Sequence, residues 1–74
     1  MKHKKTTRLV TIDREPVELY KILKFENIAA SGGEAKYFVA KGMVAVNGSV
    51  ERKKRKKIYR KDTIEIFNLI IKIN

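Results

Sequence analysis

Six consecutive basic residues, Arg52 to Lys57, lie in the middle of a chain of 74 residues. A strand or helix that packs one face against a core needs apolar side chains at a regular spacing, and this stretch has none. Burying an unpaired charged side chain costs more than a small domain recovers elsewhere. The basic run, as we call residues 52–57, must therefore stand in solvent as a sheet edge or a protruding loop.

The overall composition indicates a folded domain with a polyanionic partner. The net charge is +10, yet 43% of the residues are hydrophobic, which is too many for a disordered basic tail. Charge of this density repels itself, so it usually meets nucleic acid, an anionic membrane or an acidic protein. The length allows one domain, residues 1–74, with residues 1–7 as a mobile basic tail.

Two helices are expected. Asp13 and Pro16 indicate a helix start, and residues 17–25 show an amphipathic pattern. The second helix, within residues 31–42, has the stronger evidence. Ser31 and Glu34 form a capping box, and Gly42 occupies the position after the last turn, where a left-handed conformation costs glycine little.

The remaining segments alternate apolar and polar residues, as strands do. Strands are expected at residues 8–12, 43–50, 63–67 and 69–73, and Asn47-Gly48 favours a type I′ hairpin turn. The order of strand, helices, hairpin and further strands predicts an α+β fold.

The basic run is interpreted as an electrostatic clamp for phosphates, because neutralising phosphates releases counterions and drives sequence-independent binding. Two simpler interpretations stay open. Lysines protect sheet edges from aggregation, although eight basic residues in the ten positions 52–61 exceed that need. A localisation signal is the other.

The start of the second helix is a second candidate site for phosphate. Ser31, Gly32 and Gly33 offer unobstructed backbone N–H groups, and Lys36 lies one turn on. The alternative is that Ser31 and Glu34 form only a cap, since Glu34 repels phosphate. Tyr37 is in a position to stack on a base, but packing is the commoner role of such an aromatic side chain.

The sequence offers little chemistry besides charge. Tyr20 and Tyr59 are expected to be packing residues, and the single histidine, His3, makes no metal site without cysteine. The carboxylates are scattered among lysines, with no acid–base pair and no nucleophile beside a base. We therefore expect no enzyme activity, cofactor, metal or small-molecule substrate. We also expect no signal peptide and no membrane span, hence a cytoplasmic location.

The segment "LYKILKFENIAASGGEAKYFVAKGMVAVNGSVERKKRKKIYRKDTIEI" resembles the alpha-L RNA-binding domain family, of the S-four ribosomal-protein type. The resemblance covers about residues 16–67 and is strongest with small stand-alone bacterial members, the YaaA/YbcJ-like group. Its motifs are Ser31-Gly32-Gly33-x-Ala35-Lys36, Gly42-x-Val44-x-Val46-Asn47-Gly48, and the basic run followed by Lys57-Ile58-Tyr59 and Asp62.

The resemblance implies two helices packed against a small, mainly antiparallel sheet with a protruding basic hairpin. It also implies one RNA-facing surface, made by Ser31, Gly32, Gly33, Lys36, Arg52, Lys53, Lys54, Arg55, Lys56 and Lys57. Two positions depart from the broad family. Gly32 replaces a common arginine, which removes one RNA-contacting side chain but suits the stand-alone group, and Lys61 replaces a glycine before Asp62.

These observations predict a non-catalytic, monomeric protein that docks on structured RNA, with ribosomal RNA and a role in ribosome assembly or translation as the leading hypothesis. Recognition through phosphates is expected, because A-form RNA hides its base edges in a deep groove. The alternatives are a general nucleic-acid or DNA binder, and a basic interaction module within a ribonucleoprotein particle. Membrane binding is disfavoured, because the charge lies between strands rather than on a long amphipathic helix.

Overall fold

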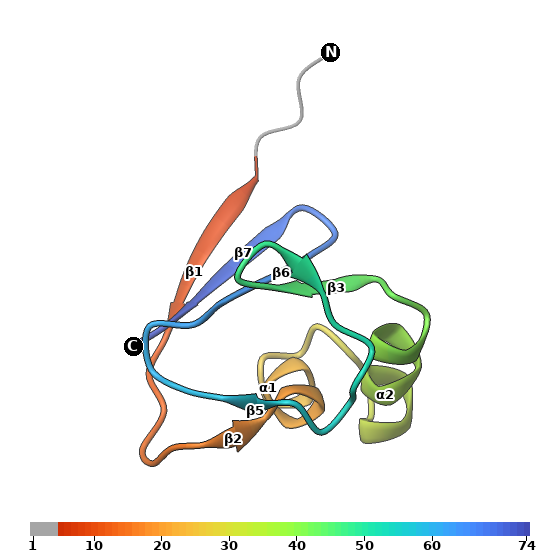
Figure 1. The fold of residues 1–74 in the computed structure, drawn as a ribbon, viewed down its shortest axis with the longest axis horizontal. Helices are drawn as coiled ribbons and strands as arrows, with labels where there is room; N and C mark the ends of the chain where they lie inside the picture. Colours follow the sequence, from red (N-terminus) through yellow and green to blue (C-terminus); the bar gives the residue numbers. More distant parts are fainter. Residues whose placement is uncertain (1–4) are drawn as a thin grey trace.

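The computed structural model describes residues 5–74, which form one sheet covered on one side by two helices and a short strand pair (Figure 1). The strands of the larger sheet are β1 (Thr6–Val10), β3 (Val44–Val46), β4 (Ser49–Val50), β6 (Thr63–Ile66) and β7 (Leu69–Ile73). The smaller sheet pairs β2 (Val17–Glu18) with β5 (Lys57–Ile58). The helices are α1 (Leu19–Phe25) and α2 (Gly32–Ala40).

The larger sheet has the order β1-β7-β6-β3-β4, with β1 parallel to β7 and every other pair antiparallel. Alternation places one side chain in two on the helix-covered face, and Ile64, Ile66 and Ile71 there are fully buried. The α+β class with a mainly antiparallel sheet is therefore confirmed.

The N-terminal strand begins earlier than predicted. Thr6 pairs with Leu69 and Val10 with Ile73, so the strand spans residues 6–10 rather than 8–12. The mobile tail predicted for residues 1–7 reaches too far for the same reason, while residues 1–4 lie outside the described residues.

The predicted start of the first helix is wrong. Asp13 and Pro16 lie in the connection after β1, Val17 and Glu18 form β2, and α1 begins only at Leu19. Glu18, its N-cap residue, makes no side-chain capping hydrogen bond. The unpaired N–H groups of the first turn therefore need acceptors from elsewhere in the chain.

The second helix agrees with its prediction. Ser31 Oγ accepts from the Glu34 N–H at 3.1 Å, and Glu34 Oε1 accepts from the N–H of Ala30, the residue before the N-cap, at 2.7 Å, which makes a variant of the capping box. Gly42 follows the helix with φ of +76°. A side chain there would be strained, and an added Cβ would lie 2.7 Å from the guanidinium of Arg52.

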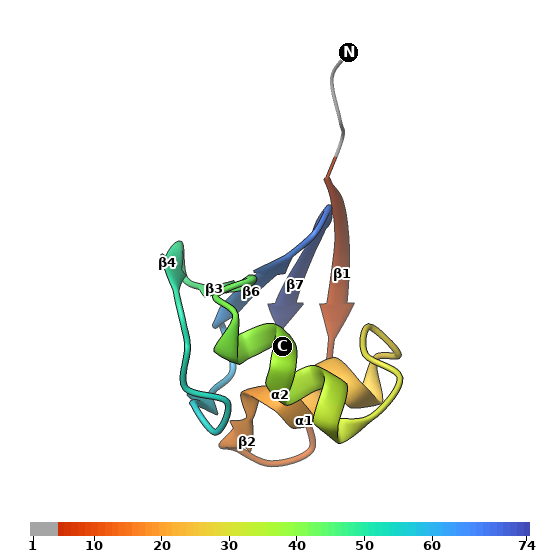
Figure 2. The same ribbon diagram turned by 90° about the vertical axis from the view of Figure 1, so that its right-hand side faces the viewer.

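The predicted hairpin turn is also present. Val46 pairs with Ser49 across Asn47 and Gly48, whose φ values of 51° and 86° are both positive, as a type I′ turn requires. In Figure 2, the chain then leaves β4 and descends along one side of the molecule towards the smaller sheet. The protruding hairpin is thus β3–β4, and the basic run is the loop that follows it.

Candidate nucleic-acid interface

The basic run links the two sheets and is exposed along its whole length. All six side chains from Arg52 to Lys57 are exposed, whereas Ile58, the next residue, is fully buried. At the other end, the Glu51 N–H donates to the Val44 carbonyl at 2.9 Å. Both ends are therefore held by the core, and the solvent exposure predicted from the sequence is confirmed.

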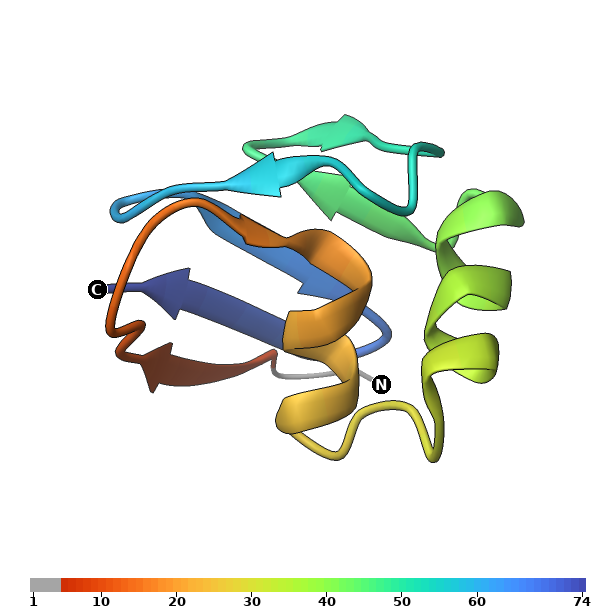
Figure 3. The ribbon, with the colours of Figure 1, turned by 90° about the horizontal axis from the view of Figure 1, so that it is seen from below.

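The backbone of the run supplies the missing cap of α1. The Leu19 N–H donates to the Lys56 carbonyl at 2.8 Å, and the Tyr20 N–H donates to the Lys54 carbonyl at 3.1 Å. These bonds satisfy N–H groups that a helix start leaves unpaired. Figure 3 shows the run passing the end of α2 and the start of α1, on one side of both helices, before it enters β5. The backbone of the run is thus committed to the fold, which leaves its side chains in solvent.

Arg52 differs from the other residues of the run. Its Nη1 donates to the Ala40 carbonyl at 3.3 Å, at the last residue of α2. A cation is favourable at the negative end of the helix dipole, and the guanidinium lies over Gly42, where a side chain would exclude it. Arg52 therefore stabilises the end of α2 as well as adding charge to the surface.

At the start of α2 the predicted groups have different roles. The Ser31 hydroxyl is occupied as a cap acceptor, so its contribution to a partner is limited to its donor hydrogen. Gly33 is exposed, whereas Gly32 is half-buried, with its Cβ position 3.8 Å from Cε2 of Tyr20. Lys36 extends from the next turn over the same tyrosine ring.

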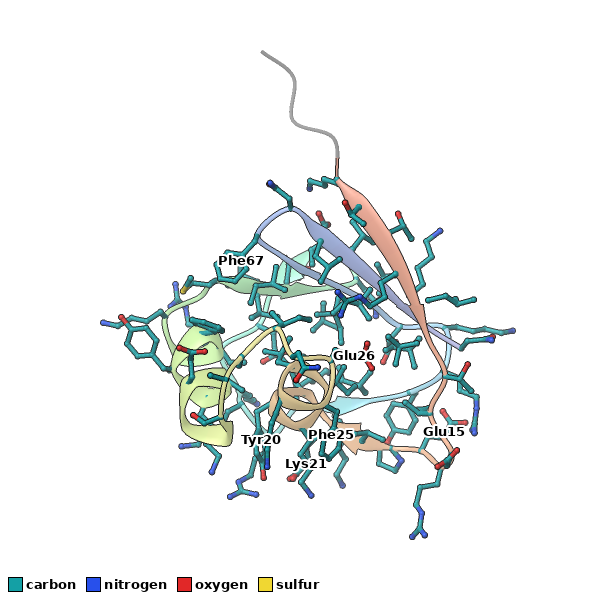
Figure 4. All side chains as sticks on the ribbon, turned by 180° about the vertical axis from the view of Figure 1, so that it is seen from behind. Glu15, Tyr20, Lys21, Phe25, Glu26 and Phe67 are labelled. Atoms are coloured by element: carbon teal, nitrogen blue, oxygen red, sulfur yellow. The ribbon has the colours of Figure 1, made fainter. Side chains whose placement is uncertain are left out.

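Tyr20 connects these two parts, a role that the sequence analysis missed. Its ring lies under Lys36 Nζ at 4.7 Å and under the Arg55 guanidinium at 5.6 Å. Figure 4 shows Tyr20 and Lys21 on the side of α1 that points away from the larger sheet. From the sequence, a tyrosine on an amphipathic helix is expected to pack against the core. Its contact with the basic run becomes visible only in the structure, because Lys54 lies 34 residues later in the chain.

Among the described residues, one acid forms an ion pair with a side chain of the run. Glu18 lies 3.4 Å from Lys21 Nζ and 3.5 Å from Nη1 of Arg55. Desolvation acts to raise the pKa of the Glu18 carboxyl, but the hydrogen bond and charge of Lys21, with the charge of Arg55, outweigh it and lower that pKa. Lys53, Lys54, Lys56 and Lys57 form no ion pair within residues 5–74.

Arg60 lies close in sequence to the run, but its side chain bonds other parts of the protein. It donates to Glu15 Oε1 at 3.1 Å and to the carbonyls of Ile12 and Asp13 at 2.9 and 3.2 Å. These bonds fasten the connection after β1 to the chain that follows β5. Of the eight basic residues in positions 52–61, this one has its guanidinium bonded to a carboxylate and two carbonyls of the protein.

Lys61, at the position where the resembled family usually has glycine, adopts a backbone conformation that glycine favours. Lys61 has φ of +77°, in the left-handed region that glycine adopts without strain. The neighbouring Asp62 carboxylate accepts from Asn47 Nδ2 at 3.0 Å and from the Tyr59 N–H at 2.8 Å. This network holds the turn despite the lysine, whose side chain is exposed.

Few other features of the described residues suggest a site. A cavity of about 290 Å³ forms an open depression between the end of β1 and α1, and none of its lining residues belongs to the basic run. Residues 5–74 contain no cluster of acids and histidine suited to a metal ion, and His3 lies outside them. No described helix is long and apolar enough to cross a membrane.

This chain is similar in sequence to a known domain family and to two bacterial proteins. The family model of the S4 domain matches residues 10–74. The probable ribosome maturation protein RlbA of Bacillus subtilis (strain 168) is 35% identical over 57 residues, which cover 77% of this chain and 80% of that protein. The putative RNA-binding protein YbcJ of Escherichia coli (strain K12) is 46% identical over 48 residues, covering 65% and 69%.

A solved structure agrees over nearly the whole chain. The solution structure of YbcJ from E. coli, described as revealing an alphaL motif involved in RNA binding, matches with a TM-score of 0.70 and 32% identity. The match covers 99% of this chain and 95% of that one.

Proposed function

The chain belongs to the S4 domain family, and from this membership we propose that it is a non-catalytic, cytoplasmic protein that binds structured RNA through phosphate contacts. The membership confirms the resemblance drawn from the Ser31, Gly42 and basic-run motifs. The ligand class follows from the relatives, because YbcJ is named as RNA-binding and RlbA as a ribosome maturation protein. We propose ribosomal RNA as the target, in ribosome assembly or translation.

One observation supports the proposal above others: the run presents exposed cations whose charge the protein does not itself neutralise. Four of its lysines form no ion pair within residues 5–74, and their backbone is already engaged in the fold. The surface that we propose for RNA, the RNA face, comprises the start of α2 and the run: Ser31, Gly32, Gly33, Lys36, Arg52, Lys53, Lys54, Arg55, Lys56 and Lys57.

The salt dependence of binding tests the electrostatic part of the proposal. With about six phosphates neutralised, log affinity against log salt concentration is expected to fall with a slope of about −4 to −5. Fluorescence anisotropy with a labelled RNA hairpin, over a series of salt concentrations, measures this slope. A slope near zero would contradict binding through phosphates.

Competition tests the class of partner. Structured RNA should displace the labelled hairpin at lower concentration than duplex DNA of equal length, because the two duplexes differ in groove shape and in the 2′-hydroxyl. Equal displacement would instead favour a general nucleic-acid binder. Absence of RNA binding, with retention in a ribonucleoprotein particle, would favour a protein-interaction module.

A further inference from the structure

Two distant parts of the chain meet at the ring of Tyr20. Lys36 comes from α2 and Arg55 from the basic run, yet both cations lie over this one ring, at 4.7 and 5.6 Å from its centroid. The backbone N–H of Tyr20 also donates to the Lys54 carbonyl at 3.1 Å. One residue of α1 therefore contacts both halves of the RNA face.

Repulsion between Lys36 and Arg55 would by itself keep these two cations apart, yet both lie over one ring. The two ring distances place the cations at most about 10 Å apart, within about one Debye length at 0.1 M salt, so salt screens their repulsion only in part. Long cationic side chains free in water would move apart. The face of an aromatic ring is electronegative and attracts both, which offsets their repulsion and restricts where they point.

A pair held in this way fits the RNA backbone better than two independent cations do. Counterion release depends on how many phosphates are neutralised, whatever the shape of the polyanion. Recognition of a structured RNA additionally requires cations at positions that match fixed phosphates. A side chain that orients cations therefore contributes to the preference for structured RNA over a flexible strand, without adding charge.

We propose that Tyr20 is a positioning residue that holds Lys36 and Arg55 as a pair against neighbouring phosphodiesters of a structured RNA. This role rests on the proposed function and adds a determinant of specificity to it. The ring of Tyr20, rather than its hydroxyl, carries the effect. Glu18 also contacts this guanidinium, at 3.5 Å, and competes with phosphate for it.

The test compares Tyr20→Leu with Tyr20→Phe, both in the full chain, on two probes of equal length: an RNA hairpin and unstructured poly(U). Tyr20→Leu should weaken binding to the hairpin about five- to ten-fold and to poly(U) less than about two-fold, with an unchanged salt slope, because no charge is lost. Tyr20→Phe should bind the hairpin within about two-fold of the wild type, because it keeps the ring.

A purely structural role gives a different result. Tyr20→Leu would then lower the thermal midpoint while the folded fraction bound both probes with wild-type affinity, and this would overturn the proposal. An equal loss with Tyr20→Phe and Tyr20→Leu would overturn it as well, since the ring would not be sufficient.

A double-mutant comparison keeps the test decisive if Tyr20→Leu folds poorly. Lys36→Gln and Arg55→Gln both leave Tyr20 in place, and together they should weaken hairpin binding little more than either does alone, because the loss of one cation already breaks the pair. Losses that multiply would mean that the two cations act independently, and this would overturn the proposal. If the wild type itself fails to bind the hairpin, the proposed function fails, whereas wild-type binding that Tyr20→Leu leaves intact rejects only the role of Tyr20.

Discussion

Two cationic regions of this domain differ in what their charges contact. In the first, the basic run, the side chains face solvent and only Arg55 contacts an acid. In the second, which we call the tied cations, each side chain bonds a carboxylate from a distant part of the chain. The tied pairs are Lys5 with Glu65, Arg8 with Glu26, and Arg60 with Glu15.

The comparison teaches that a count of basic residues overestimates how many cations are free to bind a partner, because some are already paired with acids of the protein. Exposure does not separate the two regions, because Lys5, Arg8 and Arg60 are also exposed. What separates them is the placement of the acids. Glu51, which adjoins the run, is directed to the Lys53 N–H rather than to a cation, so it holds the backbone and leaves the charge free.

The distinction between the run and the tied cations is tested most strongly by removing charge from the run while keeping Arg52 and Arg55. A quadruple Lys→Gln variant should bind an RNA hairpin about two to three orders of magnitude more weakly at 0.1 M salt, with a salt slope flatter by about 3. Its thermal midpoint should stay the same or rise, since repulsion is relieved. The positions are Lys53, Lys54, Lys56 and Lys57.

A matched control removes the same charge from elsewhere. Four exposed lysines outside the RNA face are suitable control positions. Their replacement by Gln should weaken RNA binding less than about five-fold, because only the net charge changes. Equal losses in the two quadruple variants would mean that binding follows total charge and that the run is no site. The control positions are Lys5, Lys24, Lys61 and Lys72.

Single arginines from the two regions should behave in opposite ways. Arg60→Gln should lower the free energy of unfolding by about 1–2 kcal/mol, because it loses an ion pair and two carbonyl hydrogen bonds, and should leave RNA affinity within about two-fold. Arg55→Gln should weaken RNA binding about five-fold and change stability by less than about 1 kcal/mol. Urea unfolding and anisotropy titration measure the two quantities. Similar affinity losses in both variants would remove the distinction between the regions.

The smallest expected effect concerns Glu18, the acid that pairs with Arg55 of the run. Glu18→Gln should raise RNA affinity by about two-fold, because Arg55 no longer divides its charge between a carboxylate and a phosphate. Weaker binding would mean instead that Glu18 is needed to orient Arg55.

Titration of Glu18 has a definite sign. Its pKa is lowered in the folded state, so its charge stabilises the fold above the unfolded-state pKa and that contribution is lost as the pH falls through the folded-state pKa. Carboxyl-detected NMR should show the Glu18 midpoint rising in a Lys21→Gln variant, because Lys21 provides the strongest favourable contact. An unchanged midpoint would exclude this ion pair.

Elements with a local cause were predictable from the sequence. The Ser31–Glu34 cap, the Asn47-Gly48 turn and the alternation of Ile64 and Ile66 each depend on residues a few positions apart, and each is present. The solvent exposure of the run followed from charge alone. The resemblance to a known family supplied a hypothesis that local patterns do not, namely that the start of α2 and the run form one RNA-facing surface.

Features with a distant cause were not predictable. The start of α1 depends on carbonyls of Lys54 and Lys56, which no pattern near Leu19 announces, so Asp13 and Pro16 were mistaken for the start. The parallel pairing of β1 with β7 joins the two ends of the chain. The role of Arg52 at the end of α2 likewise depends on the fold, because its target is a carbonyl that any residue offers.

The run caps α1 with backbone carbonyl groups, so this capping constrains the length of the run but not the identity of its side chains. Inserting or deleting one residue between Glu51 and Ile58 would move the Lys54 and Lys56 carbonyls out of register with the helix they cap. Exchanging a lysine of the run for another polar residue would leave those carbonyls in place. Substitutions within this loop can thus change its charge one unit at a time while the domain around it keeps its shape.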